Sequence, residues 1–180
     1  MNSVSLIRLV DEQIKQLRTN SLDLSINELV DMYTRAELVI SPEYQSLWRW
    51  NEQQQSQFIE SLILELPVPP LFVIKKADSV YELIDGLQRL SSYLHFHGNH
   101  PDYRDKQGNT HFLTLAGCHI VKELNHLTYE QLPQAIKIKL KYYLIRLEII
   151  KKESNKQLHK AWFKKLHGQD FLLTEVTQAA

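Results

Sequence analysis

The stretch from Val80 to Ser92 constrains the fold most, because its pattern changes from strand to helix within two residues. Val80 to Ile84 are rich in β-forming residues, Asp85-Gly86 interrupts them, and helical spacing of apolar residues follows. A helix that begins directly after a strand presents unpaired backbone N–H groups and the positive end of its dipole, and both favour an anion. The sequence therefore predicts a strand-to-helix turn able to bind an anion.

Short helices and strands alternate along the rest of the chain without internal repeats. This order predicts one α+β domain over residues 1–180, with a small mixed sheet flanked by helices. The spacing predicts a helical N-terminal extension over residues 1–24. The expected helices are 25–33, 51–66, 85–98, 129–140 and one from Ser154; the expected strands are 37–40, 71–75, 80–84 and 142–150, with short ones at 112–115 and 118–121.

Composition excludes several classes of protein. Lys plus Arg and Asp plus Glu both number 21, so the chain has no global positive field for nucleic acid. Cys118 is the only cysteine, which excludes an intrachain disulfide. The N-terminus lacks a signal-peptide pattern, and no run approaches the roughly twenty apolar residues of a membrane span. We therefore expect a cytoplasmic protein that does not contact a membrane.

The chemistry of the motif Asp85-Gly86-Leu87-Gln88-Arg89 fits a phosphate ligand. Gly86 has no Cβ, so a phosphate can approach its backbone, and Arg89 can bind phosphate oxygens in a bidentate pair. Both are expected to face one hollow open to solvent. Asp85 can orient a water, hold a metal-bound phosphate, or cap the helix in a capping box with Gln88, and the sequence leaves these roles open.

Other polar groups outside the motif are weaker candidates. Tyr44, Gln45 and Arg49 lie on an expected loop and can form a second wall of a pocket, while Trp50 is interpreted as a core anchor. The histidines at positions 95, 97 and 100 are interpreted as a solvated helix end, and no metal site is expected because their spacing puts them on different helix faces.

Basic residues concentrate in the last third of the chain. Lys156, Lys160 and Lys164 recur every four residues, as one stripe of a helix would. The stripe is either an exposed charged face or a contact for a DNA backbone.

An ordered series of motifs resembles the N-terminal domain of GmrSD-type restriction endonucleases, a prokaryotic family related to ParB and sulfiredoxin folds. The residues that carry the resemblance are Pro42-Glu43-Tyr44-Gln45, Trp50, Phe58 to Leu64, Leu66-Pro67-Val68-Pro69-Pro70 and Asp85 to Ser91. Three features depart from the family pattern. Leu87 replaces a glutamine of the motif, Ser46 replaces an arginine, and His167 to Asp170 replace an Asn-Thr-Gly-Gly run.

Gly117-Cys118-His119 is similar to the sulfiredoxin active site, but the next residue is Ile120 instead of arginine, and we exclude sulfiredoxin activity.

The resemblance implies a ParB/sulfiredoxin-like fold and a nucleotide-sensing module of a restriction or anti-phage defence system. It implies that Gly86, Gln88 and Arg89, with Tyr44, Gln45 and Arg49, bind a nucleoside triphosphate with Mg²⁺. Some members of the family hydrolyse the nucleotide, and Asp85 is the catalytic candidate for an NTPase here. Nuclease activity is expected from a separate chain or from a domain absent here. The alternative is a degenerate domain that binds DNA or a protein without turning over a nucleotide.

Overall fold

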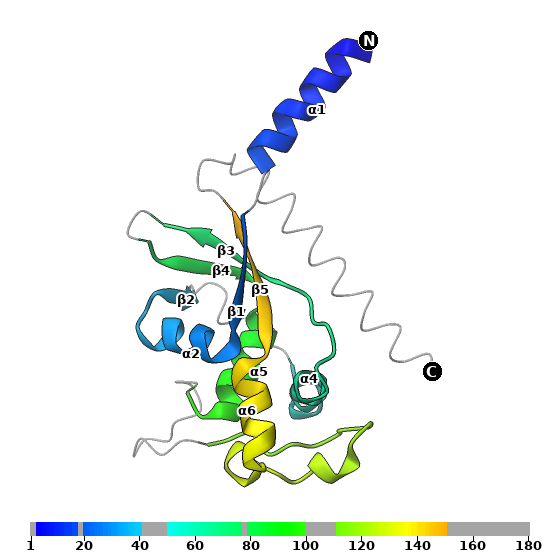
Figure 1. Ribbon diagram of the computed structural model, residues 1–180, viewed down its shortest axis with the longest axis vertical. Coiled ribbons are helices and arrows are strands. Elements are labelled where there is room, and N and C mark those ends of the chain that lie inside the picture. Colours follow the sequence, from blue (N-terminus) through cyan, green and yellow to red (C-terminus); the bar gives the residue numbers. More distant parts are fainter. Residues whose placement is uncertain (1–2, 18–19, 41–49, 77–78, 100–110, 151–180) are drawn as a thin grey trace.

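The structure is a computed structural model that describes residues 3–17, 20–40, 50–76, 79–99 and 111–150. Helices and strands alternate along these ranges (Figure 1). The elements are α1 (Ser3–Leu17), β1 (Asn20–Ser25), α2 (Ile26–Thr34), β2 (Leu38–Ile40), α4 (Glu52–Ile63), β3 (Leu71–Lys75), β4 (Tyr81–Asp85), α5 (Leu87–His97), α6 (Gln134–Tyr142) and β5 (Leu144–Ile150), with 3₁₀ turns η2 (Lys122–Leu124) and η3 (Tyr129–Gln131).

The strands form a five-stranded mixed sheet in the order β1-β5-β3-β4-β2. β1 is antiparallel to β5, β5 is parallel to β3, β3 is antiparallel to β4, and β4 is parallel to β2. These directions place the C-terminal ends of β1, β2 and β4 at the same end of the sheet as the N-terminal ends of β3 and β5. Helices α2, α4, α5 and α6 lie toward this end of the sheet, in the lower part of Figure 1. The expectation of an α+β domain with a small mixed sheet is confirmed.

Local signals in the sequence place several elements correctly. Asn51 and Gln54 form the capping box that begins α4, and the side chain of Ser25 accepts a hydrogen bond from the Glu28 N–H at the start of α2. β3 and β4 form the expected hairpin, and Gly98 ends α5 in the left-handed conformation.

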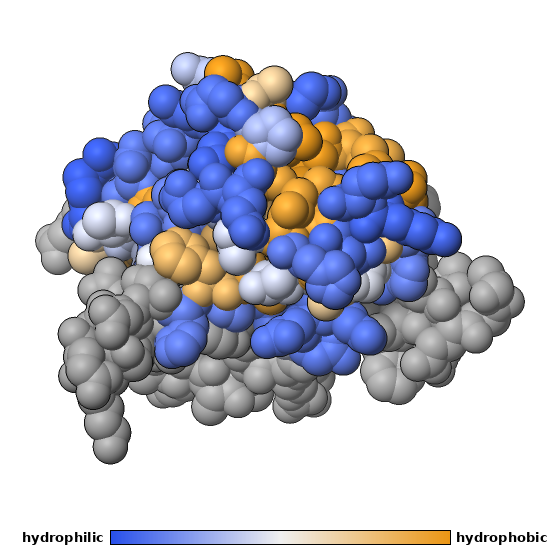
Figure 2. Space-filling model, turned by 90° about the horizontal axis from the view of Figure 1, so that it is seen from below, coloured by the Kyte–Doolittle hydropathy of each residue, from blue (hydrophilic) through white to orange (hydrophobic). Residues whose placement is uncertain are grey.

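The core joins the sheet to α2, α4 and α5. Leu71, Val73 and Leu147 from the sheet are fully buried, as are Ile59 and Leu94 from the helices. Apolar residues also reach the surface, and the face seen from below in Figure 2 has an apolar area bordered by polar residues. None of the described helices has the length and apolar character needed to cross a membrane.

Three element predictions are wrong. The N-terminal helix stops at Leu17, and 20–25 form β1, because Leu22 and Leu24 align with Leu147 and Ile145 of β5. Residues 111–121 contain no strand and form a loop instead. Residue 142 belongs to α6 and not to the last strand, which starts at Leu144.

Helix α1 projects away from the body of the domain in Figure 1, and its described apolar side chains are exposed: Leu6, Ile7, Leu9, Val10 and Ile14. A helix of this length is only marginally stable on its own and is usually stabilised by burying an apolar face. The exposed apolar side chains of α1 provide no such burial, so α1 adds little to the stability of the domain. Deletion of residues 1–19 is therefore expected to change the melting temperature by less than about 2 °C in thermal unfolding followed by circular dichroism.

The comparison variant for this deletion is Leu94→Ala, which removes a side chain with 0% exposure from α5. Truncation of such a core leucine costs about 2–5 kcal/mol, so the melting temperature falls by several degrees. A fall of similar size after the deletion would mean that α1 packs against the domain in solution.

Candidate functional site

The motif lies at the turn from β4 to α5, as the sequence predicts. β4 ends at Asp85, Gly86 takes the N-cap position with φ +100°, and α5 begins at Leu87. A register shift opposite Phe72 leaves Ile84 as a bulge just before the turn. Strand, bulge and left-handed glycine together set the direction in which α5 leaves the sheet.

The capping box between Asp85 and Gln88, one of the roles that the sequence leaves open for Asp85, is not formed. The Asp85 carboxylate instead accepts a hydrogen bond from Nη2 of Arg89 at 2.9 Å, and the same nitrogen donates to the Pro70 carbonyl at 3.2 Å. The two charged side chains are only 9% and 7% exposed. An ion pair with a guanidinium in the interior is stronger than a bond from the same carboxylate to a neutral backbone N–H, which favours Arg89 as the partner.

This ion pair corrects the expectation that Arg89 faces an open hollow. Arg89 ties the first turn of α5 to the end of β4 and to the residue before β3, so it holds the turn together from inside. Gly86 is buried as well, and a Cβ built on it would meet Cδ2 of Leu71. The missing side chain at Gly86 therefore makes room for Leu71, not for an approaching phosphate.

Gln88 is half-buried, and its Oε1 accepts a hydrogen bond from the Trp50 N–H at 3.0 Å. Trp50 packs against Phe58, with ring centroids 5.8 Å apart, and both contact the hydrophobic core, as predicted for a core anchor. Leu87 also packs against the core, which agrees with its helical spacing to Leu90.

Residues 41–49 lie outside the described part of the chain, and with them Tyr44, Gln45 and Arg49. The residues that flank this segment are described, and both lie beside the motif. Ile40 at the end of β2 pairs with Leu83 of β4, and Trp50 is hydrogen-bonded to Gln88. The two described residues on either side of this segment therefore lie beside the turn. Lys156, Lys160 and Lys164 also lie outside the described residues.

The prediction of a solvated helix end at the histidines is wrong for His95 and His97, and His100 lies outside the described residues. His95 is buried with 3% exposure, and its Nδ1 lies 2.9 Å from Oε1 of Gln55 on α4. His97 is half-buried between the rings of Tyr93 and Tyr129, with centroids 5.8 and 4.6 Å away. Among the described residues, no group of three or more His, Cys, Asp or Glu side chains could hold a metal ion.

Burial lowers the pKa of His97 below its ordinary value of 6.5, although Asn99, Glu130 and Asp31 oppose this shift. Well above pH 6.5, the His97 side chain is neutral in both the folded and the unfolded state. As the pH falls from 6.5 through the pKa of folded His97, the unfolded state binds the proton first, so stability is lost.

We expect His97→Phe to remove this part of the decline in the free energy of unfolding between pH 8 and pH 5, measured by urea denaturation. His126→Asn is the control, because His126 is exposed and asparagine tolerates its positive φ. An unchanged slope in His97→Phe would contradict the assignment.

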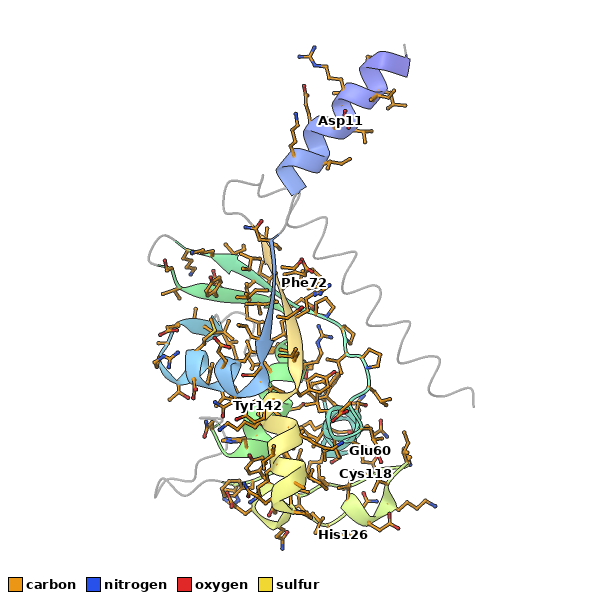
Figure 3. The ribbon with its side chains drawn as sticks, viewed as in Figure 1. Asp11, Glu60, Phe72, Cys118, His126 and Tyr142 are labelled. Atoms are coloured by element: carbon orange, nitrogen blue, oxygen red, sulfur yellow. The ribbon has the colours of Figure 1, made fainter. Side chains whose placement is uncertain are left out.

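Sequence reasoning missed Gln55, with 2% exposure, and Glu60, with 4%. The Glu60 carboxylate on α4 accepts hydrogen bonds from three consecutive backbone N–H groups of the 119–121 loop, beside Cys118 (Figure 3). Gln55 shares a face of α4 with Phe58 and Ile59, three and four residues further on, and a polar residue on such an apolar face was the available signal. Glu60 lies one turn after Ser56, and its position on the helix gave no such signal. Burial raises the pKa of the Cys118 thiol to about 11, so the thiol is protonated at neutral pH, in agreement with the exclusion of sulfiredoxin chemistry.

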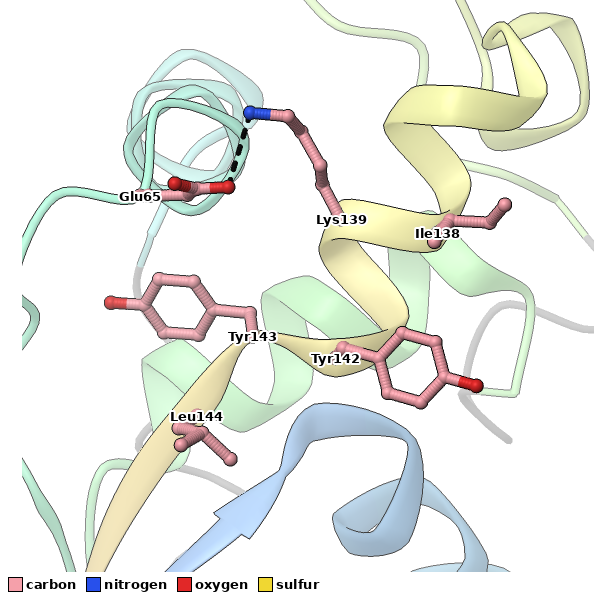
Figure 4. Close-up of a pocket in the computed structure, with 6 residues that line it drawn as sticks. All are labelled: Glu65, Ile138, Lys139, Tyr142, Tyr143 and Leu144. Atoms are coloured by element: carbon pink, nitrogen blue, oxygen red, sulfur yellow. Dashed lines mark hydrogen bonds and ion pairs between the residues drawn. The ribbon is translucent and has the colours of Figure 1, made fainter.

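A hollow of about 370 Å³ lies elsewhere, between the end of α4 and the junction of α6 with β5 (Figure 4). Its lining includes Ile138, Tyr142 and Leu144, together with Lys139 and Glu65, which form an ion pair at 3.1 Å. Its walls are mostly apolar, so the hollow does not supply the phosphate contacts expected at the motif.

The family model for the N-terminal domain of the GmrSD restriction endonuclease matches residues 26–177. The chain belongs to this family, which makes it a restriction-system module. No curated protein and no solved structure matches the chain. The finer expectation of a ParB/sulfiredoxin-like fold stays a prediction.

Proposed function

We propose that this chain is a nucleotide-binding sensor of a restriction or anti-phage defence system, and that it binds the phosphates of a nucleoside triphosphate, with Mg²⁺, at the start of α5. The observation that carries the proposal is the position of this turn. It stands where the parallel strands β2 and β4 both end, which is where open α/β sheets bind ligands. Gly86 occupies the N-cap, where no side-chain hydrogen bond caps α5, and the positive end of the helix dipole favours an anion there.

The residues of the motif take different parts in this proposal. Gln88 and the backbone of the first turn contact the phosphates, because Gln88 is the half-buried polar side chain of that turn. Arg89 supports the turn from inside, since its guanidinium is engaged by Asp85. Tyr44, Gln45 and Arg49 form the opposite wall, and the described residues on either side of them, Ile40 and Trp50, support this because both lie beside the turn.

Binding without turnover is the form of the proposal that the geometry favours. The catalytic candidate Asp85 is 8% exposed and paired with Arg89, so it is poorly placed to activate a water. In the complete system, nucleotide binding would control a nuclease supplied by another domain or by a separate chain.

The test is a thermal-shift panel of the four nucleoside triphosphates, with and without Mg²⁺. At a ligand concentration of about 100 times Kd, binding stabilises the folded state by about 2.7 kcal/mol, which raises the melting temperature by several degrees. Gln88→Ala is expected to reduce the shift. Gln134→Ala is the matched control, because Gln134 is an exposed glutamine in the first turn of α6.

A wild-type protein that shifts with none of the nucleotides contradicts the proposal. Binding to DNA or a protein would then be the better reading. A DNA affinity that falls with salt and weakens in Lys156→Ala, Lys160→Ala or Lys164→Ala would support the DNA alternative. Phosphate release that Asp85→Asn abolishes, in a variant that remains folded, would instead establish an NTPase.

A further inference from the structure

The N-terminal part of the chain carries two surfaces that no described residue covers. β1 is the last strand on one side of the sheet, so its outer edge has no partner strand among the described residues. The apolar face of α1 is exposed as well. An edge strand with unpaired N–H and C=O groups is a template for a further strand. Both surfaces precede residue 26, where the family match begins, so they belong to this chain and not to the family pattern.

The hydrogen bonds of β1 show which of its backbone groups face this outer edge. The Ile26 N–H donates to the Tyr143 carbonyl at 2.9 Å, directly after β1. Hydrogen-bonded pairs alternate along an antiparallel ladder, so Leu22, four residues earlier, also exchanges its bonds with β5. Ser21 and Asp23 therefore direct their N–H and C=O groups away from β5, toward the outer edge.

We propose that the outer edge of β1 pairs with β1 of a second copy of this chain, antiparallel and about a two-fold axis, so that two sheets join into one. Residues opposite each other must lie on the same face, so Leu22 or Asp23 faces its own copy when the strands are centred. Two Asp23 carboxylates directly opposite each other would repel. Leu22 opposite its own copy covers a side chain that is 41% exposed. In this register Ser21 exchanges hydrogen bonds with Asp23 of the second copy.

The same pairing brings α1 to the hollow of the second copy. Within one chain the two are far apart, because α1 precedes β1 at the Asn20 end, whereas the hollow includes Leu144, which pairs with Ser25 at the other end. Figure 1 shows α1 and α6 beyond opposite ends of β1. An antiparallel partner reverses this order, so its Leu144 lies at the end where α1 leaves. β5 of that copy is two strand spacings, about 10 Å, from β1, and α1 is about 22 Å long.

The two faces that meet in this arrangement are both apolar. Val10 and Ile14 lie on one face of α1, and the ion pair of Arg8 with Glu12, at 3.2 Å, lies on the opposite face. The hollow presents exposed apolar side chains: Ile138, Tyr142 and Leu144. The two-fold axis places each α1 on the hollow of the other copy, so the assembly closes at two chains.

The charge of α1 favours a protein surface over a membrane as its partner. Amphipathic helices that lie on membranes carry mainly Lys and Arg on the polar face. In α1, Arg8 and Lys15 are balanced by Asp11 and Glu12. A neutral polar face gives no attraction to anionic lipids, and it fits the rim of a protein interface.

Ser21→Pro tests the strand pairing. It removes an N–H from the outer edge, and proline is tolerated on an edge strand where its missing N–H faces away from the ladder. Sedimentation velocity from about 1 to about 200 µM covers micromolar dissociation constants. The dimer Kd is expected to rise at least about tenfold. Ser21→Ala is the matched control, because it also loses the bond from Ser21 to Glu148 but keeps the N–H. Its Kd should stay within about threefold of the wild type.

The double variant Val10→Gln/Ile14→Gln tests the docking of α1. Glutamine keeps the helix propensity but removes the apolar contact, so the dimer Kd is again expected to rise at least about tenfold. Arg8→Gln/Lys15→Gln is the matched control, with the same new residues on the polar face of the same helix. It should leave Kd within about threefold of the wild type.

Leu22→Cys tests the register. Across the axis two such residues form a non-hydrogen-bonded pair with Cα atoms about 4.5 Å apart, which allows a disulfide. Asp23→Cys is the control, because residue 23 lies about 8 Å from its own copy in this register, too far for a disulfide. The native Cys118 is buried. Under oxidation the first variant is expected to form a covalent dimer on a non-reducing gel, and the second is not.

These results decide the proposal without any nucleotide, so they are independent of the proposed function. A wild type that stays monomeric at about 200 µM overturns it, as does a dimer that withstands Ser21→Pro or Val10→Gln/Ile14→Gln. Cross-linking through Asp23→Cys but not Leu22→Cys overturns the register. Leu22→Cys decides the strand pairing if Ser21→Pro does not fold. Deletion of residues 1–19 has its small effect in dilute protein, where the monomer dominates; only the wild type should melt higher as concentration rises.

Discussion

Replacement of Arg89 by alanine is expected to lower the free energy of unfolding by about 3–5 kcal/mol, because it leaves the buried Asp85 carboxylate without its cation. The two side chains are 7% and 9% exposed, and their charged atoms are 2.9 Å apart. Arg89 also donates to the Pro70 carbonyl, so the variant loses the link between α5 and the start of β3. Urea denaturation followed by circular dichroism measures the loss.

Arg146→Ala is the matched control for Arg89→Ala. Arg146 forms a similar ion pair with Asp23 at 2.9 Å, but these side chains are 56% and 48% exposed, and such surface pairs contribute at most about 1 kcal/mol. The double variant Asp85→Leu/Arg89→Met should recover much of the stability, because apolar residues of similar size can replace a buried ion pair. Equal losses in Arg89→Ala and Arg146→Ala would mean that Arg89 is open to solvent.

This expected loss changes how the motif should be tested. The sequence makes Arg89 the natural choice for a ligand-binding variant, yet its removal destabilises the turn and would abolish binding even without any ligand contact. Gln88 is the better probe, because its side chain reaches the surface and bonds to the backbone of Trp50. Loss of binding in Gln88→Ala with an intact melting curve therefore tests contact, not folding.

The elements that the sequence predicts well depend on short-range chemistry. Asn51 and Gln54 cap α4 through bonds to each other's backbone N–H groups, and Gly98 ends α5 because it adopts a positive φ without strain. The hairpin of β3 and β4 depends on two adjacent β-rich runs. Each signal acts over a few residues, so distant parts of the chain cannot override it easily.

Contacts between distant residues decide the parts that the sequence does not predict. Asp85 can reach the helix N–H groups three residues ahead or Arg89 four residues ahead, and local spacing permits both. Pro70 and Leu71 favour the ion pair, because the Pro70 carbonyl accepts a second hydrogen bond from Arg89 and Leu71 packs against Gly86. In the same way, residues 20–25 become a strand because they pair with β5, which lies more than a hundred residues further along the chain.

Glu60→Ala is the second variant for which we expect a large loss, about 3–5 kcal/mol of unfolding free energy. The Glu60 carboxylate accepts hydrogen bonds from the N–H groups of His119, Ile120 and Val121 at 3.0, 2.9 and 2.7 Å. Without it, three backbone donors lose their partner at a partly buried site, and each lost bond costs about 1–3 kcal/mol before the loop relaxes toward water. Glu60→Gln keeps one acceptor oxygen and should lose less.

Glu65→Ala is the matched control, because Glu65 follows the same helix and its carboxylate also has a partner, the ammonium group of Lys139, but its side chain is 60% exposed. Its removal is expected to change stability by less than about 1 kcal/mol in the same urea experiment. Hydrogen exchange gives a local readout, since the amides of the 119–121 loop should exchange much faster in Glu60→Ala and at the wild-type rate in Glu65→Ala. If Glu60→Ala and Glu65→Ala have equal stability and equal exchange in this loop, the carboxylate of Glu60 does not hold the loop.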